Sequence, residues 1–257
     1  MEKVRYEVAD GVATVTIARP EVRNAMDLEV FQGLADAAGR ADADEAVRAV
    51  VVTGEGQAFS SGIDVSIFAE GLASQRPIDI GSLQRSYTSF ERCSKPVIAA
   101  IHGTAFGGGI QLALACDLRV AAADAELSVM ETRWGIIPDL GAIHRLPRII
   151  GIGRAKDMLL TGRRVPAEEA LQLGLVNRVV PADQDVKEAT EWARELAAGP
   201  PLALARIKRL VGAAFDVTID AGLEREASAQ RPVLASDDFR EAVTARMEKR
   251  EPRYRNT

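Results

Sequence analysis

Residues 103–117 read GTAFGGGIQLALACD, and three consecutive glycines, Gly107 to Gly109, lead directly into an apolar, alanine-rich stretch. Alanine and leucine favour helix, so the composition predicts a helix whose first turn contains the glycines. The first N–H groups of a helix have no partner within the helix, and they lie at the positive end of its dipole. The stretch therefore predicts a helix start that binds an anionic oxygen.

Phosphate is the obvious candidate for that oxygen, but the sequence lacks the spacing that phosphate sites use. No GxxxxGK[ST] motif occurs, and GEGQAF at 54–59 begins like a dinucleotide motif but has Phe59 in place of the third glycine. A GxSxG elbow is absent, and we interpret His102 and His144, the only histidines, as packed structural residues. We expect no metal site, because metal ligands at recognisable spacing are absent too.

The segments around this stretch predict an α/β protein with a helical C-terminal region. A hairpin is expected over 4–17, because Asp10-Gly11 tolerates the positive φ of a tight turn. Asp27 is expected to cap a helix, and Leu83, Tyr87 and Phe90 mark another. Further strands are expected at 48–54, 96–102, within 117–129 and at 175–180. We expect the chain to divide into an α/β core, 1–198, and a helical C-terminal region, 199–257, with a hinge at the GPP sequence of 199–201.

The composition excludes several classes of function. The chain has 257 residues, 47% of them hydrophobic, and a formal net charge of −5, which argues against a nucleic-acid surface. Cys93 and Cys116 are too few for a disulfide framework, so a reducing cytoplasm is expected. The N-terminus lacks a secretion signal and no 18 apolar residues run together, so we expect no membrane association.

Four motifs together resemble the enoyl-CoA hydratase/isomerase family, the crotonase superfamily. These motifs are RPEVRNAM at 19–26, AFSSGIDVSIF at 58–68, GTAFGGGIQLALACD at 103–117 and TGRRVPAEEALQLGLVNRVVP at 161–181. The resemblance implies a core of stacked ββα turns and a helical C-terminal region that mediates assembly into a homotrimer or a dimer of trimers. It also implies an acyl-CoA substrate and no other cofactor, since coenzyme A is part of the substrate.

The resemblance implies an oxyanion hole formed by the backbone N–H groups of Ile63 and Gly108. Removing a proton beside a thioester leaves negative charge on the carbonyl oxygen, and two fixed N–H donors stabilise that enolate. The family's coenzyme A pocket maps to Arg23, Asn24 and Ala25, with Ile63 to Val65 opposite, and Arg19, Arg23 and Lys249 are candidates to meet the phosphates. Solvated surface charge is the alternative interpretation of these cations. The implied substrate-binding set is Arg23, Asn24, Ala25, Ser61, Gly62, Asp64, Val65, Gly107 and Lys249.

The catalytic positions depart from the hydratase pattern. Hydratases of the family carry two glutamates, and the first position is Gln111 here, whose amide cannot accept a proton. Glu131 matches the second glutamate, and Asp139 stands where dienoyl-CoA isomerases of the family have aspartate. The alternatives are a surface glutamate for Glu131, a helix N-cap for Asp139 and a local hydrogen bond for Gln111.

These residues favour double-bond isomerisation of an unsaturated acyl-CoA through an enolate. One carboxylate, Glu131, could take a proton from the carbon α to the thioester and return it at the γ carbon, and Asp139 could serve a dienoyl chain. Hydration of 2-enoyl-CoA and a divergent acyl-CoA binder with little activity remain alternatives. A nucleotide-dependent oxidoreductase would require a co-purifying nicotinamide or flavin. The glycine, serine and proline content of residues 68–84 predicts a mobile loop that helps to form the pocket wall.

Overall fold

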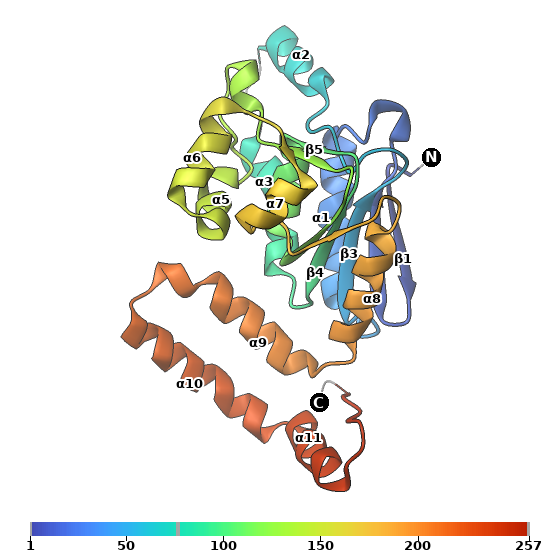
Figure 1. Cartoon of the computed structure of the whole chain (residues 1–257), viewed down its shortest axis with the longest axis vertical. Coiled ribbons are helices and arrows are strands. Elements are labelled where there is room, and N and C mark those ends of the chain that lie inside the picture. Colours follow the sequence, from blue (N-terminus) through green and yellow to red (C-terminus); the bar gives the residue numbers. More distant parts are fainter. Residues whose placement is uncertain (1, 76–77, 256–257) are drawn as a thin grey trace.

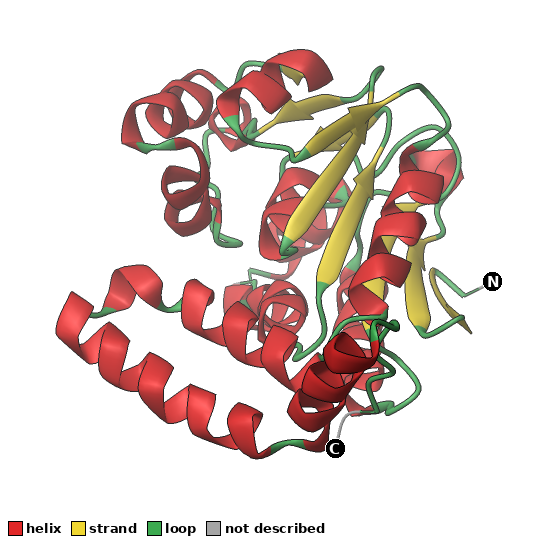
Figure 2. Cartoon of the chain, turned by 60° about the horizontal axis from the view of Figure 1, so that its bottom comes forward, coloured by secondary structure: helices red, strands yellow, loops and turns green. Residues whose placement is uncertain are grey.

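The computed structural model describes residues 2–75 and 78–255, and within them the chain forms two sheets surrounded by helices (Figures 1 and 2). The main sheet has the strand order β1-β2-β3-β4-β6-β9, and the smaller sheet has the order β5-β7-β8. The strands are β1 (Val4–Ala9), β2 (Val12–Ile17), β3 (Ala49–Gly54), β4 (Val97–Ile101), β5 (Thr104–Phe106), β6 (Leu118–Ala122), β7 (Glu126–Ser128), β8 (Val165–Pro166) and β9 (Arg178–Val180). The predicted α/β class is confirmed.

The β1–β2 hairpin forms as the sequence predicts. The two strands pair antiparallel from Val4 with Ile17 to Ala9 with Val12. Asp10 and Gly11 form the turn between them with φ angles of 51° and 77°. Both residues are left-handed, which is the conformation that a two-residue turn between right-twisted strands requires. From β2 onward, each neighbouring pair in the main sheet is parallel.

The central strands β3 and β4 are buried on both faces, because alternate apolar side chains enter two separate cores. Val50 and Val52 of β3 enter the larger core, which also holds residues of α1 (Leu28–Ala43) and α3 (Ile80–Arg92). Ala49 and Val51 enter a smaller core against α8 (Asp185–Ala197). The apolar runs at 48–54 and 96–102 are therefore explained by burial on two sides.

Successive turns of the chain give one strand to each sheet and then a helix. The order β4, β5 and α4 (Gly108–Ala115) is followed by β6, β7 and α5 (Ala142–Ile150), so these are the predicted stacked ββα turns. The remaining helical elements of the core are η1 (Pro20–Val22), α2 (Val65–Ser74), η2 (Glu131–Trp134), α6 (Ile152–Thr161) and α7 (Ala167–Leu173). Asp27 caps α1 as predicted, because its carboxylate accepts a hydrogen bond of 3.0 Å from the N–H of Val30.

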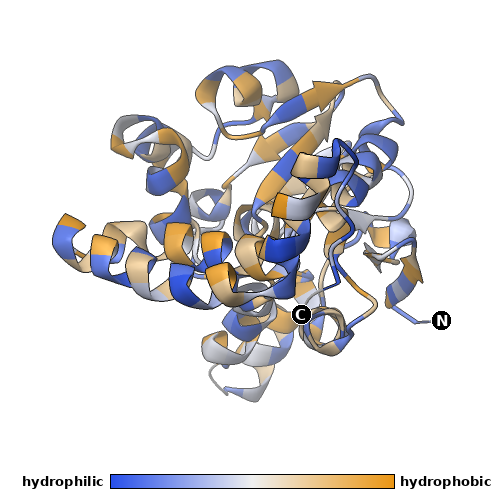
Figure 3. Cartoon of the chain, turned by 90° about the horizontal axis from the view of Figure 1, so that it is seen from below, coloured by the Kyte–Doolittle hydropathy of each residue, from blue (hydrophilic) through white to orange (hydrophobic). Residues whose placement is uncertain are grey.

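The C-terminal helices α9 (Pro201–Gly212) and α10 (Ile219–Ala235) pack side by side, away from the main sheet (Figure 1). They are followed by α11 (Asp237–Glu248), and η3 (Ala214–Asp216) joins the first two. Neither α9 nor α10 contains a buried residue, and apolar residues are spread along both helices (Figure 3). In the described residues, no helix has both the length and the apolar content that crossing a membrane requires.

Two expectations need correction. The stretch 68–84 is mainly helical rather than a loop, since α2 extends to Ser74 and α3 begins at Ile80, while positions 76 and 77 lie outside the described residues. The strand expected at 175–180 is shorter than the apolar pattern suggests. Only Arg178–Val180 pairs with β6, because Leu175 and Val176 pack into the larger core beside α7.

A buried histidine–aspartate pair joins the end of β4 to the start of α8. His102 Nδ1 lies 2.9 Å from Asp185 Oδ2, and their side chains are 15% and 4% exposed. Burial by itself lowers the pKa of His102, but the hydrogen bond and charge of Asp185, with the charges of Asp124 and Asp183, outweigh it. The pKa of His102 therefore lies above its ordinary value of 6.5. His102 is thus a structural residue, as the sequence suggests.

A histidine whose pKa is raised by folding stabilises the protein below its unfolded pKa, and this contribution is lost as pH rises through the folded pKa. We expect Asp185→Asn to reduce the free energy of unfolding by about 1.5 kcal/mol more at acidic than at alkaline pH. Denaturant unfolding from about pH 5.5 to about pH 9 measures this difference. Asp183→Asn, which alters a nearby charge without a hydrogen bond to His102, should show a smaller pH dependence. A pH-independent loss in Asp185→Asn would contradict the assignment.

Candidate active site

Two backbone segments from different parts of the chain meet at the start of α4. Ser60 bridges to Ala105, because the N–H of Ser60 donates to the carbonyl of Thr104 and the N–H of Phe106 donates to the carbonyl of Ser60, both at 3.0 Å. On the other side of the first segment, Met26 pairs with Ile63. The segment 60–63 is therefore held between the residues that precede α1 and those that precede α4.

Glycine is required where these segments approach most closely. Gly62 has a φ of +107°, and a Cβ atom there would lie 2.9 Å from the carbonyl oxygen of Phe106. A Cβ on Gly109 would lie 2.5 Å from the carbonyl oxygen of Ser60. Real Cβ atoms do not come this close to a backbone oxygen, so any side chain would separate the two segments. The glycines of both motifs thus permit the contact between them.

The backbone N–H groups of Ile63 and Gly108 donate no hydrogen bond to any group within residues 2–75 and 78–255. They belong to the two segments just described, and a Cβ on Gly62 would lie 3.3 Å from the nitrogen of Gly108. Tyr87, a fully buried residue of α3, donates from Oη to the carbonyl of Gly108 at 2.9 Å and so holds the first turn of α4. The arrangement leaves two N–H donors free for a ligand.

A pocket of about 360 Å³ lies at these donors. Nine of the residues that the sequence predicted for the site line it: Ala25, Ser61, Gly62, Ile63, Asp64, Val65, Gly107, Gly108 and Glu131. Phe68, the first residue of the stretch expected to help form the pocket wall, also lines it, and the sequence reasoning missed four others: Val22, Met130, Trp134 and Ile136. They are all apolar, and their only signal was that they neighbour predicted residues. A larger hollow of about 790 Å³ near α11 is lined by charged side chains such as Glu241 and Arg250, which pair with each other.

Glu131, the first residue of η2, is buried with 7% of its surface exposed. Its Oε1 atom accepts a hydrogen bond of 2.7 Å from Nε2 of Gln111, and its Oε2 atom is buried and has no partner in the described residues. Burial raises the pKa of Glu131, and the charge of Asp139 adds to the effect, although the Gln111 hydrogen bond opposes it. The surface-glutamate alternative is therefore wrong. Glu131 is a buried carboxyl group with raised basicity.

Gln111 is almost completely buried, with 1% exposure, and its amide joins two parts of the site. While Nε2 reaches Glu131, the carbonyl oxygen Oε1 accepts hydrogen bonds from the N–H groups of Leu140 (3.0 Å) and Ala142 (3.1 Å). These partners lie 29 and 31 residues away in sequence. The bonds are therefore long-range, and the alternative of a purely local hydrogen bond is wrong.

Asp139 lies outside the residues that line the pocket but near enough to Glu131 to raise the pKa of that carboxyl. Burial also raises the pKa of Asp139 itself. The helix-cap alternative is wrong, because α5 begins at Ala142, its N-cap is Gly141, and no side chain caps it. Asp139 is positioned through its backbone, since Gln84 Nε2 donates to its carbonyl at 2.6 Å.

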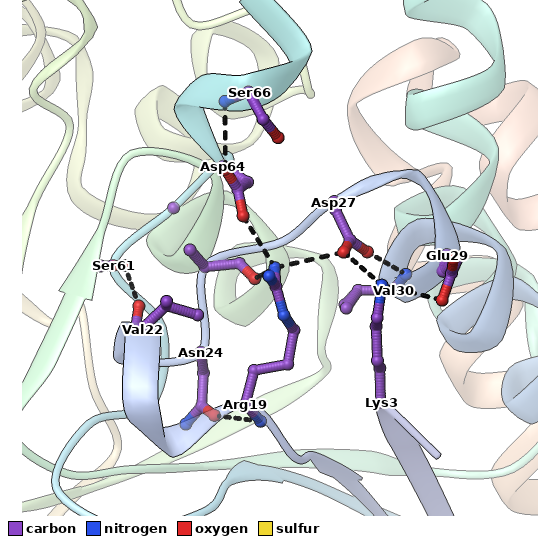
Figure 4. Close-up of polar contacts among 12 residues, drawn as sticks. Lys3, Arg19, Val22, Asn24, Asp27, Glu29, Val30, Ser61, Asp64 and Ser66 are labelled. Atoms are coloured by element: carbon purple, nitrogen blue, oxygen red, sulfur yellow. Dashed lines mark hydrogen bonds and ion pairs between the residues drawn. The ribbon is translucent and has the colours of Figure 1, made fainter. Parts of the chain in front are cut away.

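The cations near the pocket differ in whether they are free. Arg19 is occupied, because its Nη1 donates to the carbonyl of Ala25 at 2.6 Å and pairs with Asp64 at 2.9 Å and with Asp27 at 3.4 Å (Figure 4). This pairing also uses one oxygen of Asp64, while the other caps α2 through the N–H of Ser66. Arg23 is exposed. The expectation that Arg19 meets phosphate is therefore less well supported than the same expectation for Arg23.

Asn24 is fully buried and is not among the residues that line the pocket, so its side chain does not serve as a binding group there. Its Nδ2 donates to the carbonyls of Glu55 and Ala58, its Oδ1 accepts from the N–H of Arg19, and its backbone carbonyl accepts from Ser60 Oγ. Asn24 thus holds the turn that presents Ala25. Lys249 is also not brought to this pocket: it follows α11, at the end of the molecule opposite α2 (Figure 1). No cluster of metal-binding side chains occurs among the described residues.

Comparison with known proteins shows what this chain is similar to. A family model described as enoyl-CoA hydratase/isomerase matches residues 7–257. A peroxisomal Δ(3,5)-Δ(2,4)-dienoyl-CoA isomerase from Arabidopsis thaliana is 35% identical, with 99% of this chain and 96% of that protein covered. A crotonyl-CoA hydratase from Syntrophomonas wolfei is 34% identical, with 98% of each chain covered. The crystal structure of an enoyl-CoA hydratase from Bacillus anthracis superposes with a TM-score of 0.94 at 34% identity, covering 99% of this chain and 100% of the other.

The close contact at Gly62 can be tested by adding a single methyl group. Gly62→Ala should destabilise the protein by about 1–3 kcal/mol, because it places a side chain in a left-handed conformation and against the Phe106 carbonyl. Gly39→Ala is the matched control. Gly39 lies in α1 with open space where a methyl group would stand, so alanine there should stabilise by about 0.5–1 kcal/mol. Denaturant unfolding of both variants measures the difference, and equal effects would argue against the close approach.

Proposed function

The chain belongs to the enoyl-CoA hydratase/isomerase family, and we propose that within this family it moves a double bond in an unsaturated acyl-CoA thioester. The thioester oxygen accepts hydrogen bonds from the N–H groups of Ile63 and Gly108, which have no other partner in the described residues. These donors stabilise the enolate that forms when a proton leaves the carbon next to the thioester, and losing one such donor typically costs about 10²- to 10³-fold in rate.

The free oxygen of Glu131 carries the proposal. Oε2 is buried, unpartnered in the described part of the chain, and belongs to a residue that lines the pocket beside the two donors. Its raised pKa makes Glu131 a stronger base than an exposed glutamate, which suits removal of a weakly acidic C–H proton. In the proposed reaction, Glu131 takes the proton from the α carbon and returns it at the γ carbon. One carbon–hydrogen bond breaks at the α carbon and one forms at the γ carbon. The double bond thereby moves by one position into conjugation with the thioester carbonyl.

Asp139 extends the proposal to dienoyl substrates. It is near Glu131 and has a raised pKa, so it can hold a proton beside a second carbon of a longer, conjugated acyl chain. A dienoyl enolate spreads its charge further from the thioester, and protonation at the ε carbon by Asp139 shifts both double bonds. The similarity to a dienoyl-CoA isomerase supports this version of the reaction.

Hydration is the second candidate, because relatives with that name are equally similar. A hydratase must hold a water molecule between two groups that exchange protons with it. Here the carbonyl oxygen of Gln111 already accepts two backbone hydrogen bonds, and its Nε2 donates to Glu131. With both lone pairs used, Gln111 cannot accept a hydrogen bond from water, and its amide cannot exchange a proton with it, which favours isomerisation.

Substrate panels and two variants test the assignment. We expect turnover of 3-enoyl-CoA and 3,5-dienoyl-CoA, and Glu131→Gln should lower kcat by about 10²- to 10⁴-fold because it removes the base but keeps the shape. Asp139→Asn should affect the dienoyl substrate selectively. Glu45→Gln, the same change at an exposed position, serves as control. Efficient hydration of 2-enoyl-CoA without isomerisation would contradict the proposal, and tight binding of acyl-CoA without any turnover would support a binder.

The assembly and location remain proposals. Large apolar side chains on the C-terminal helices are exposed, among them Val211 (66%), Phe215 (73%) and Ile219 (75%), and a groove of about 600 Å³ lies between α9 and α10. We propose that these helices are covered by neighbouring copies in a trimer or a dimer of trimers. The cytoplasmic location stays a prediction from the sequence, and one relative is named as peroxisomal.

Light scattering at micromolar concentration measures the assembly. The wild-type mass should be a multiple of three chains, and Val211→Glu should reduce it because a charge would be buried in the interface. Val8→Glu, at an exposed position on β1, is the control that should leave the mass unchanged. A monomeric wild-type protein would exclude the proposed assembly.

A further inference from the structure

We propose that Gln111 is a positioning residue that confines the proton carried by Glu131 to a single oxygen atom, Oε2. The proposal rests on the proposed function in one respect, namely that Glu131 takes up and returns a proton. It assigns Gln111 a role that differs from orienting water. That role follows from the direction in which the Gln111 amide points and from what each of its atoms can donate or accept.

The orientation of the amide follows from its partners. The backbone N–H groups of Leu140 and Ala142 both point at one terminal atom of Gln111, at 3.0 and 3.1 Å. Both partners are donors, so this atom must be the carbonyl oxygen, because an NH₂ group cannot accept them. The NH₂ group is therefore the one that faces Glu131, at 2.7 Å from Oε1.

This orientation restricts the position of the proton on Glu131. Nε2 of Gln111 can only donate, so Oε1 must present a lone pair to it. A proton on Oε1 that points at Gln111 would place two hydrogen atoms between heavy atoms 2.7 Å apart. A proton on the other lone pair of Oε1 would turn that oxygen into a hydroxyl, which accepts the Gln111 hydrogen bond more weakly than a carbonyl oxygen does. Oε2 has no such neighbour, since nothing in the described part of the chain hydrogen-bonds to it. When Glu131 is neutral, its proton is on Oε2, and when it is charged, Oε2 is the oxygen left free as the base.

The other ionisable groups near Glu131 in the described structure do not replace this restraint. Asp139 and Tyr87 interact with it electrostatically, and neither hydrogen-bonds to its carboxylate. Tyr87 instead uses its hydroxyl hydrogen on the carbonyl of Gly108. Both Gln111 and Glu131 are also more than nine-tenths buried, so bulk water has little access to take over the hydrogen bond.

A glutamate at position 111 would behave differently. One of its oxygens could still accept from Leu140 and Ala142, but the other would face Oε1 of Glu131 with no hydrogen between them. The two carboxyl groups would have to share a proton, and they would titrate as a coupled pair. The amide thus makes Glu131 an independent acid with one active oxygen, which fits a reaction in which the same atom takes and returns a proton.

Titration of the ligand-free protein tests this role without relying on activity. With carbon-13-labelled glutamate, and Glu131→Gln to assign the signal, the Glu131 carboxyl should titrate in one step. Gln111→Met retains the length but removes the donor that favours the charged form, so the pKa of Glu131 should rise. Gln111→Glu should convert the single step into two. Gln32→Glu adds the same charge at an exposed position on α1 and should leave the titration unchanged.

A kinetic measurement complements the titration. We expect Gln111→Met to lower kcat on 3-enoyl-CoA by about 10- to 100-fold with little change in KM, and to shift the acidic limb of the pH profile upward. A purely structural role would lower activity without shifting that limb.

The outcomes separate the two proposals. An unchanged Glu131 titration in folded Gln111→Met overturns the positioning role, whatever the activity. If Gln111→Met does not fold, Gln111→Glu, which has the same shape as glutamine, takes its place as the test. A single-step titration of Gln111→Glu then overturns the positioning role of Gln111. A wild-type protein that turns over no 3-enoyl or dienoyl thioester, but shows the expected titrations, overturns the proposed function alone.

Discussion

The close approach of two backbone segments, 60–63 and 105–109, is the constraint on which the site depends. A sheet places the two segments side by side, but only glycine at positions 62 and 109 lets them come within contact of each other's carbonyl oxygens. Because of that contact, two N–H groups from distant parts of the sequence meet at one pocket, without partners among the described residues. Glycine loses more conformational entropy on folding than other residues, so the arrangement costs stability. The two buried cores on either side of the main sheet compensate for it.

In the site, the negative charge and the hydrogen-bond donor beside it belong to two different side chains. Glu131 carries the carboxyl group that we propose as the base, and a neutral amide, Gln111, connects it to the loop before α5. Burial strengthens the carboxylate as a base, while the amide supplies a donor without adding a second negative charge next to it. Hydration needs a water molecule between two acids, whereas isomerisation needs one proton carrier. In this framework the two reactions therefore differ by one functional group, the amide or carboxyl at position 111.

The sequence predicts those parts of the fold that depend on local patterns. The turn at Asp10-Gly11, the apolar runs of β3 and β4 and the glycines before α4 all follow from residue type and spacing. The backbone partners of the Gln111 carbonyl, Leu140 and Ala142, could not be predicted this way, because they lie about thirty residues further along the chain. The helix-cap alternative for Asp139 was wrong, because α5 begins later, at Ala142, and its N-cap is Gly141. The position of Asn24 in a motif suggests a binding residue, but its side-chain amide instead holds the turn before Ala25 through the carbonyls of Glu55 and Ala58.

The chain has two tryptophans, and their surroundings differ. Trp134 lines the pocket with 64% of its surface exposed, whereas Trp192 on α8 stacks beneath the guanidinium of Arg178 at 3.7 Å. Indole emission shifts to shorter wavelength when water leaves its surroundings, so a ligand that covers the pocket should change the fluorescence of Trp134 and leave that of Trp192 nearly constant. The protein therefore contains its own optical reporter of occupancy, and any saturated thioester that enters the pocket without reacting can be followed by it.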